Sequence, residues 1–198
     1  MGFYLPLILL WVLFGLSHSL LAAEWWKGWV ASVTGVYFRY YRLVYSFIAL
    51  FLLVVIIVYE LRLPADWLWR TSPVLLIVFS IPALAGLLIM GICIRRYFFY
   101  LSGIDVLFPA RQVSLGLATG GLNRYVRHPL YFGTLLTMWS FFVLLPAMHY
   151  LVTCCMVTVY TWLGAVLEEK KLRKEFGEVY ADYQRRVPML IPFKMKLG

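Results

Sequence analysis

Charged residues are scarce in this sequence, and their scarcity excludes an ordinary soluble domain. Aspartate, glutamate, lysine and arginine make up 14% of the 198 residues, whereas 63% are hydrophobic. A soluble fold needs more polar surface than this composition supplies, so the sequence predicts an integral membrane protein. The aromatic content of 18% includes tryptophans near the ends of apolar stretches, which is typical of side chains anchored at headgroup depth.

Cysteine is also rare and forms no recognisable pattern. Cys93, Cys154 and Cys155 all lie inside apolar stretches, without a CxxC pair or an even extracellular set. A disulfide framework and a zinc site are therefore not indicated, and we interpret the three thiols as packing residues. No metal site is predicted.

The sequence motifs of common soluble enzymes are missing. It contains no Walker loop, no GxGxxG after a strand, no GxSxG and no HExxH. The net charge of +9 raises the question of nucleic acid, but the basic residues flank apolar segments instead of forming one stripe or an RNA-reading motif. We therefore expect no nucleic-acid partner, and membrane lipids as the surroundings.

Long apolar segments predict an all-α fold with about five transmembrane helices in a single membrane domain, 1–198. The first segment resembles a signal peptide, yet it lacks a basic start and its apolar run of about 20 residues is long enough to span. The last two are separated only by Leu145 and Pro146, which predicts a tight helical hairpin. The five segments are residues 3–22, 43–58, 73–94, 130–145 and 147–167.

The basic residues predict an orientation in the membrane. Most of the 18 lysines and arginines fall in the first loop, the third loop and the tail. The positive-inside rule places these segments in the cytoplasm, with the N-terminus outside and the C-terminus inside, in the inner (plasma) membrane of a bacterium.

Two polar segments differ from simple connectors. Residues 95–128 are too polar to span and too long for a plain loop, and long loops of this kind are often functional. Residues 168–186 have apolar side chains at helical spacing and predict an amphipathic helix at the cytoplasmic surface, with Gly177 as a candidate interruption. Pro188 and Pro192 end the helical pattern.

Charged clusters bracket the predicted hairpin. Residues 127–133 read RHPLYFG at its start, and residues 168–172 read EEKKL after its end. Arginine, histidine and paired glutamates are costly at a bilayer surface unless they are solvated, paired or holding something polar. The two clusters therefore predict a site for a polar ligand.

The order of these motifs resembles the isoprenylcysteine carboxyl methyltransferase family and its phospholipid methyltransferase relatives. In that superfamily an RHPxYxG element and an EExxL…FGxxYxxY element build the S-adenosylmethionine pocket, and both are present here over residues 119–192. Residues 124–131, residues 187–192 and the HSLLA stretch that begins at His18 look most like the methanethiol S-methyltransferase branch. The HSLLA stretch also occurs in related denitrification-associated membrane proteins.

The resemblance implies a membrane methyltransferase with its cofactor-binding and catalytic half at 95–198. Arginine or histidine would suit the carboxylate of S-adenosylmethionine, glutamates its ammonium or ribose, and glycines would let backbone approach the adenine. Which member of each pair takes which group stays open. The predicted cofactor-binding residues are Thr119, Gly120, Gly121, Leu122, Arg127, His128, Tyr131, Glu168 and Glu169.

The methyl acceptor is predicted to be a small thiol such as methanethiol, reached from the membrane. Such a thiol is mostly protonated at neutral pH and needs a nearby base or cation, for which His18, Arg95 and Arg96 are the catalytic candidates. His18 has the alternative of packing against a neighbouring helix. The alternatives for function are carboxyl methylation of a prenylcysteine-like substrate, N-methylation of a lipid-like substrate, and a non-catalytic protein that retains the fold for membrane binding or assembly. Oligomeric state is not indicated.

Overall fold

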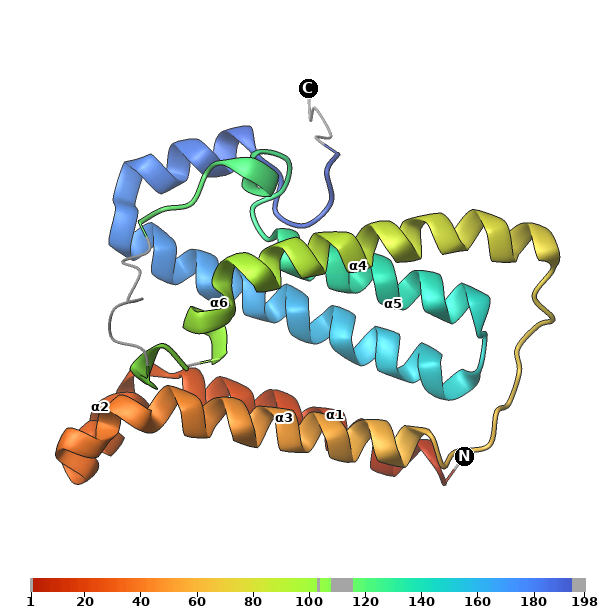
Figure 1. Cartoon of the computed structure of the whole chain (residues 1–198), viewed down its shortest axis with the longest axis horizontal. Coiled ribbons are helices and arrows are strands. Elements are labelled where there is room, and N and C mark those ends of the chain that lie inside the picture. The colour runs from red at the N-terminus through yellow and green to blue at the C-terminus, as the bar shows by residue number, and fades with distance from the viewer. Residues whose placement is uncertain (1, 103, 108–115, 194–198) are drawn as a thin grey trace. The chain divides into compact units, whose positions relative to one another are not determined.

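The computed structural model describes residues 2–102, 104–107 and 116–193. It divides into two compact units (Figure 1). The first falls within Met1–Asp66, Tyr97–Val113 and Ala147–Met156, and the second within Trp67–Arg96, Ser114–Pro146 and Val157–Gly198. Among the described residues every regular element is a helix, which confirms the predicted all-α class.

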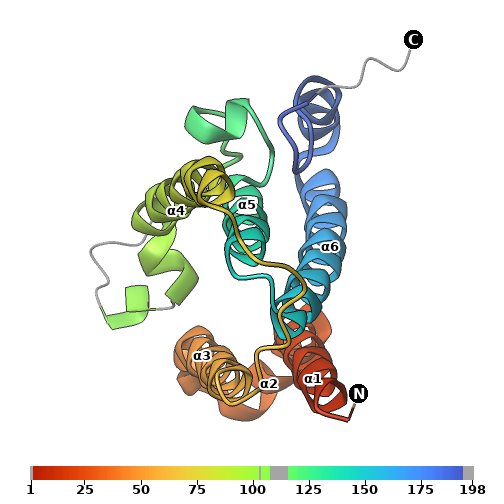
Figure 2. The same cartoon turned by 90° about the vertical axis from the view of Figure 1, so that its right-hand side faces the viewer.

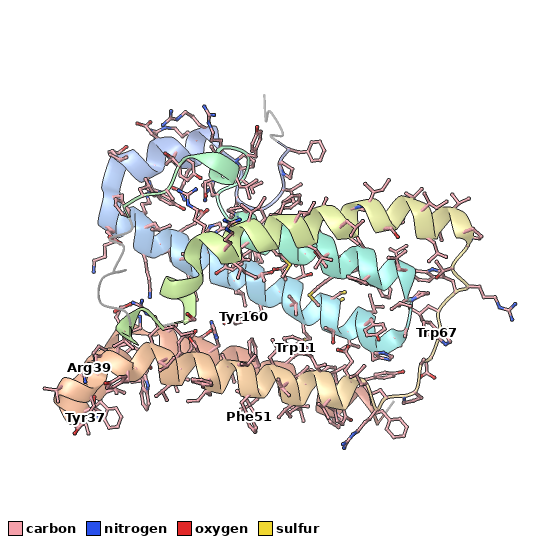
Figure 3. The ribbon with its side chains drawn as sticks, in the orientation of Figure 1. Trp11, Tyr37, Arg39, Phe51, Trp67 and Tyr160 are labelled. Atoms are coloured by element: carbon pink, nitrogen blue, oxygen red, sulfur yellow. The ribbon has the colours of Figure 1, made fainter. Side chains whose placement is uncertain are left out.

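The first unit is built on two long helices that lie side by side, α1 and α3 (Figure 2). Both are apolar along most of their length, and their outer side chains face away from the pair, as Phe51 shows (Figure 3). Exposed apolar side chains along a spanning helix are what lipid contact requires. The elements are α1 (Tyr4–Ala22), α2 (Glu24–Thr34), the 3-10 helix η1 (Gly35–Tyr40) and α3 (Tyr41–Glu60).

The connector between α1 and α3 is itself helical, which the sequence pattern did not predict. Helix α2 has only 11 residues, too few to span a bilayer. It exposes Trp25, Trp29 and Val33, spaced four residues apart on one face. A short helix with such a face is suited to lie in the membrane interface. Gly35, with a positive φ of 54°, ends it.

A buried polar network joins three helices of the first unit. Trp11 of α1 donates its Nε1–H to Thr153 Oγ1 at 3.1 Å, and Thr153 donates to Glu60 Oε1 at 2.6 Å. Thr153 belongs to the first residues of α6 (Met148–Arg186), and Glu60 is the last residue of α3. All three side chains are buried. Glu60, an ionisable residue, is tolerated in this buried position because it is hydrogen-bonded.

The second unit contains α4 (Pro73–Ser102) up to Arg96, α5 (Pro129–Leu144) and α6 from Val157 onward. Figure 2 shows α5 between α4 and α6. Helices α4 and α5 approach closely where Gly86 faces Gly133, since a Cβ added at Gly86 would lie 2.8 Å from the carbonyl oxygen of Gly133. Helices α5 and α6 are joined by Trp139 Nε1–H, which donates to Thr158 Oγ1 at 3.0 Å.

The predicted helical hairpin is confirmed, although α5 is short. Helix α5 ends at Leu144 and α6 begins at Met148. Four helical segments of the described chain are long and apolar enough to cross a membrane. Helix α5, with 16 residues, is shorter than each of these four. Four to five apolar helices of the described chain are therefore able to span a membrane. The four segments are Tyr4–Ala22, Glu24–Glu60, Pro73–Arg96 and Met148–Arg186, of which Glu24–Glu60 combines α2, η1 and α3.

Helix α6 is 39 residues long and combines the fifth predicted span with the predicted amphipathic helix. At about 1.5 Å per residue it is longer than a bilayer core is thick, so its charged half, from Glu168 onward, projects beyond the apolar half. Gly177 has φ 53° and ψ −129°, outside the helical region, and breaks the helix as predicted. In Figure 1 the blue end of α6 turns back at this part of the chain.

The polar segment 95–128 is only partly helical. Helix α4 continues to Ser102, the 3-10 helix η2 covers Ile104–Leu107, and the 3-10 helix η4 covers Gly121–Arg124. Residues 103 and 108–115 of this segment lie outside the described residues.

Candidate cofactor site

The segment before α5 places Arg127 and His128 at the start of a helix. His128 is the N-cap of α5, with φ −120° and ψ 71°, and Pro129 is the first helical residue. Proline suits this position because its missing N–H has no helical partner there and its φ is already helical. The first backbone bond, from Phe132 N–H to His128 O at 3.0 Å, closes the turn. The imidazole is thereby held at a fixed point beside α6.

The two glutamates of α6 contact different partners, because adjacent helix residues point about 100° apart. Glu168 accepts a hydrogen bond from the Tyr131 hydroxyl at 3.1 Å, and its Oε2 lies 3.5 Å from His128 Nδ1. Glu169 faces inward, with 11% of its side chain exposed against 47% for Glu168. The structure therefore separates the glutamate pair into one inner and one outer carboxylate.

Both oxygens of Glu169 receive hydrogen bonds. Arg127 Nε donates to Oε1 at 2.6 Å, His128 Nε2 lies 3.3 Å from the same oxygen, and the amide of Gln184 donates to Oε2 at 2.7 Å. A buried carboxylate is stable only when its charge is paired and its lone pairs are used. Glu169 meets that condition within the chain itself.

His128 lies between the two carboxylates, and its ring stacks on Tyr131 with centroids 5.3 Å apart and planes 11° apart. Burial lowers the pKa of His128, but hydrogen bonds and charge from Glu168 and Glu169 outweigh burial, so its pKa is raised above the ordinary value. The imidazolium form is favoured, with Nδ1 toward Glu168 and Nε2 toward Glu169.

The raised pKa of His128 predicts a pH dependence of stability. The folded protein holds the proton more tightly than the unfolded chain, so His128 stabilises the fold fully below about pH 6.5, and this contribution is lost as pH rises through the raised value. We expect the free energy of unfolding, and with it the melting temperature, to fall as the pH rises from about 6.5 through the raised pKa, the free energy by at most about 1.4 kcal/mol per pH unit from this group.

Thermal melts of the purified protein and of His128→Gln measure that slope. Glutamine supplies a side-chain amide that can donate a hydrogen bond but does not titrate, so the melting temperature of the variant should change less over the same range. Glu178→Gln, an exposed change on α6, is the matched control and should keep the slope. An equal slope in His128→Gln and the unaltered protein would assign the pH dependence to another group.

Arg127 is occupied by contacts within the chain. Besides Glu169, its guanidinium donates through Nη1 to the carbonyl oxygens of Gln184, at 3.2 Å, and Val187. Only 9% of its side chain is exposed. These contacts tie the start of α5 to the end of α6.

The backbone reinforces the same connection. The N–H groups of Arg127 and His128 donate to the carbonyl oxygens of Pro188 and Met189 at 2.9 and 3.1 Å. Asn123 Nδ2 donates to the carbonyl oxygen of Arg127 at 3.1 Å. The residues after α6 are therefore part of the site, and Figure 1 shows the green segment that precedes α5 alongside this blue end.

The glycine-rich stretch lies in the same unit. Thr119, Gly120 and Gly121 are exposed and Leu122 is half-buried. Gly121 begins η4 with a left-handed φ of 63°, which a side chain would strain. A Cβ there would also lie 3.4 Å from Nη1 of Arg96, so Arg96 of α4 packs beside this turn.

The predicted catalytic residues fall in both units. Arg95 and Arg96 belong to the second unit with the glycine-rich stretch and the two motifs. His18 belongs to the first unit, where it shares a hydrogen bond with the Tyr45 hydroxyl of α3 and stacks on Phe14, with centroids 5.6 Å apart. The contact with α3 is the kind of helix packing that the sequence left as the alternative for His18.

Two groups of the site, one outward-facing and one buried, offer features that suit a polar ligand. Glu168 presents an outward carboxylate beside a tyrosine hydroxyl, which suits an ammonium group or ribose hydroxyls. The hydroxyl of Tyr180 is buried with no hydrogen-bond partner among the described residues, within the electrostatic influence of Glu169 and Arg127. Unpartnered buried hydroxyls are uncommon and call for an occupant such as water or a ligand. The residues present therefore fit S-adenosylmethionine.

Comparison with known proteins gives the family. Residues 6–195 match the family described as NnrU protein. The chain belongs to this family. As a member of the NnrU protein family it is also similar to named enzymes: 32% identical to "Methanethiol S-methyltransferase" of Pseudomonas deceptionensis, over 93% of this chain and 71% of that relative. It is 30% identical to "Methanethiol S-methyltransferase" of Crocosphaera subtropica, over 91% and 71%.

These similarities confirm the resemblance predicted from the two motifs, including its methanethiol S-methyltransferase branch. No solved structure matches this member of the family. The structure also adds Gln184 to the site, a residue that the sequence analysis did not single out. Its sequence signal is weak, since it is a polar side chain eight residues before Pro192.

Proposed function

We propose that this protein is a membrane methyltransferase that methylates the sulfur of a small thiol such as methanethiol, with S-adenosylmethionine as the methyl donor. The observation that carries the proposal is the similarity to methanethiol S-methyltransferases over more than nine-tenths of the chain. The paired motifs around His128, Glu168 and Glu169 support it, because they form one hydrogen-bonded cluster with an outward carboxylate.

The geometry favours particular residues for the cofactor. Glu168 and Tyr131 would take its ammonium or ribose hydroxyls, and protonated His128 would neutralise the carboxylates around it and attract the cofactor's carboxylate. Arg127, with its guanidinium donating to Glu169 and to two carbonyls, would support the site instead of reaching the ligand. The exposed stretch from Thr119 through Leu122 would receive the adenine.

The reaction requires little acid-base chemistry from the chain. S-adenosylmethionine, when bound, supplies a methyl group activated by a sulfonium. The chain orients the reactants and keeps water from them, which accelerates attack by an anion on a cation. The thiol must lose its proton, for which His18 is the candidate base, and Arg95 and Arg96 are candidate cations that would favour the thiolate.

We propose the orientation that the basic loops predict, in a bacterial inner membrane. The N-terminus would lie outside, and the site around Glu168 would open to the cytoplasm, from which the cofactor would enter. A small apolar thiol would arrive through the lipid. Attachment of a membrane-impermeant thiol reagent to a cysteine added after Met1, and its exclusion from one added after Gly198, would support this orientation.

The test is cofactor binding followed by turnover. Calorimetry on the detergent-purified protein should show binding of S-adenosylmethionine, and addition of methanethiol should yield S-adenosylhomocysteine. A prenylcysteine and phosphatidylethanolamine are the comparison acceptors. Glu168→Gln should weaken binding about tenfold or more, the loss expected for one charge-assisted contact. Glu178→Gln, an exposed change on the same helix, should not weaken it.

Turnover with only the prenylcysteine, or with only the lipid, would identify that compound as the methyl acceptor in place of the small thiol. Binding without turnover on any of the three would favour a protein that retains the fold for binding or assembly. No binding by the unaltered protein would reject the proposal.

A further inference from the structure

Gln184 connects the inner glutamate to the segment after α6. It lies beyond the break at Gly177, and its side-chain amide donates to Glu169 Oε2 at 2.7 Å. Its own backbone carbonyl oxygen accepts from Arg127 Nη1 at 3.2 Å. One residue therefore contacts both members of the buried Arg127–Glu169 ion pair.

The contacts of Glu169 leave it a supporting role. One of its oxygens faces Arg127 and His128, and the other accepts from Gln184. Glu168, by contrast, is the half-exposed carboxylate, held by the Tyr131 hydroxyl and His128. His128 touches both glutamates, so the orientation of Glu169 is transmitted to Glu168 through the imidazole.

We propose that Gln184 is a positioning residue for the cofactor site, whose amide fixes Glu169 and so holds His128 in the orientation that presents Glu168 to the cofactor. The inference rests on the proposed function, since it names a residue that supports the same site. Gln184 itself touches no reacting atom.

The chemistry of the contact requires an amide at this position. Glu169 is ionised and only accepts hydrogen bonds, so its partner at Oε2 must be a donor. A carboxylate at position 184 would have the same shape and no donor. Two carboxylates at hydrogen-bond distance repel each other, which raises the pKa at which the pair binds a shared proton.

Other charged and titratable groups face Glu169 and bear on that proton. Arg127 and His128 approach from the segment before α5, and Glu168 and Tyr180 lie on α6. Arg127 and His128 are unchanged in a variant at position 184. A difference in pH dependence between that variant and the unaltered protein therefore reports the new carboxylate pair.

Gln184→Glu is the principal test, with calorimetric affinity for S-adenosylmethionine measured at about pH 8 and about pH 5.5. At the higher pH its Kd should be about tenfold or more above that of the unaltered protein, the loss of one hydrogen bond to a charged group. At the lower pH the shared proton restores a donor, so the ratio of the variant's Kd to that of the unaltered protein should shrink. At saturating cofactor kcat should stay within about threefold, because binding and not the methyl transfer is altered.

Three further proteins sharpen the test. Gln184→Leu removes the donor without adding a charge, so its loss of affinity should be the same at both pH values. The double variant Glu169→Gln with Gln184→Glu exchanges the two groups and restores a donor–acceptor pair, so the pH dependence of the ratio should disappear. Glu178→Gln, an exposed change after the same break in α6, is the control and should match the unaltered protein.

The outcomes separate the two proposals. Absence of S-adenosylmethionine binding by the unaltered protein rejects the proposed function, and this inference with it. Normal binding by the unaltered protein with an unchanged Kd in Gln184→Glu at both pH values overturns the inference alone. An equal loss in Gln184→Glu at both pH values also overturns it, because that result is the one expected from a general disturbance of the fold.

Discussion

Replacing Arg127 by methionine is expected to destabilise the ligand-free protein by about 3–5 kcal/mol, because it removes one partner of a buried ion pair and leaves the other buried. The guanidinium donates to Glu169 at 2.6 Å and to the carbonyl oxygens of Gln184 and Val187. Methionine has a similar length but no donor. One carboxylate and two carbonyl groups therefore lose the same donor at once.

The measurement is the melting temperature of the detergent-purified protein without cofactor, beside its affinity for S-adenosylmethionine. Arg185→Met is the matched control, since Arg185 is exposed and, among the described residues, forms its ion pairs at the helix surface with Asp182 and Glu178. Exposed pairs contribute about 0–1 kcal/mol, so the control should melt close to the unaltered protein. If Arg127 only held the cofactor carboxylate, Arg127→Met would lose affinity without losing ligand-free stability.

A lysine at position 127 separates charge from geometry. Lysine keeps the positive charge beside Glu169 but offers a single ammonium in place of a planar fork, so it cannot reach the glutamate and both carbonyl groups together. Arg127→Lys is expected to melt between Arg127→Met and the unaltered protein. Full recovery would mean that charge alone matters and that the two carbonyl contacts contribute nothing.

Features with a local cause were predictable from the sequence. Proline at the first position of α5 and glycine at the break in α6 act through their own backbone preferences, so Pro129 and Gly177 predict their structures without knowledge of any neighbour. The length of an apolar run likewise predicts a spanning helix, and the tight hairpin follows from the lack of polar residues around Pro146.

The different contacts of the two glutamates and of Arg127 have no local cause in the sequence. Glu168 and Glu169 are neighbours of identical chemistry, and only the turn of α6 relative to His128 makes one outer and the other inner. The carbonyl partners of Arg127 lie about 60 positions away along the chain. A charge pattern marks Arg127 as polar, but it cannot say which carboxylate and carbonyl oxygens its guanidinium contacts.

The contact between α4 and α5 is the second feature that local patterns do not reveal, and it predicts a large effect. Gly86 lies within a long apolar run and carries no signal of its own. A Cβ at Gly86 would lie 2.3 Å from Thr137 Oγ1, 2.8 Å from the Gly133 carbonyl oxygen and 2.9 Å from the Thr137 nitrogen. Two of these three atoms are backbone, so a larger residue can be accepted only if the helices separate.

Gly86→Val is therefore expected to lower stability by about 1–3 kcal/mol or more, the cost typical of overpacking, and to weaken cofactor binding as well. Helix α5 begins immediately after His128 and carries Tyr131 in its first turn, so a shift of α5 moves both away from Glu168. Melting temperature and calorimetric affinity for S-adenosylmethionine measure the two effects on the same preparation.

Gly91→Val is the matched control for this substitution. Gly91 lies on the same helix, and a Cβ there would meet nothing within 4 Å. Since Gly86 closely approaches α5 and Gly91 does not, Gly91→Val should leave both the melting temperature and the affinity near those of the unaltered protein. Equal losses in the two variants would trace the effect to valine's poor fit in a helix. A loss confined to Gly86→Val would show that the close approach of two glycines sets the position of the histidine on which the site depends.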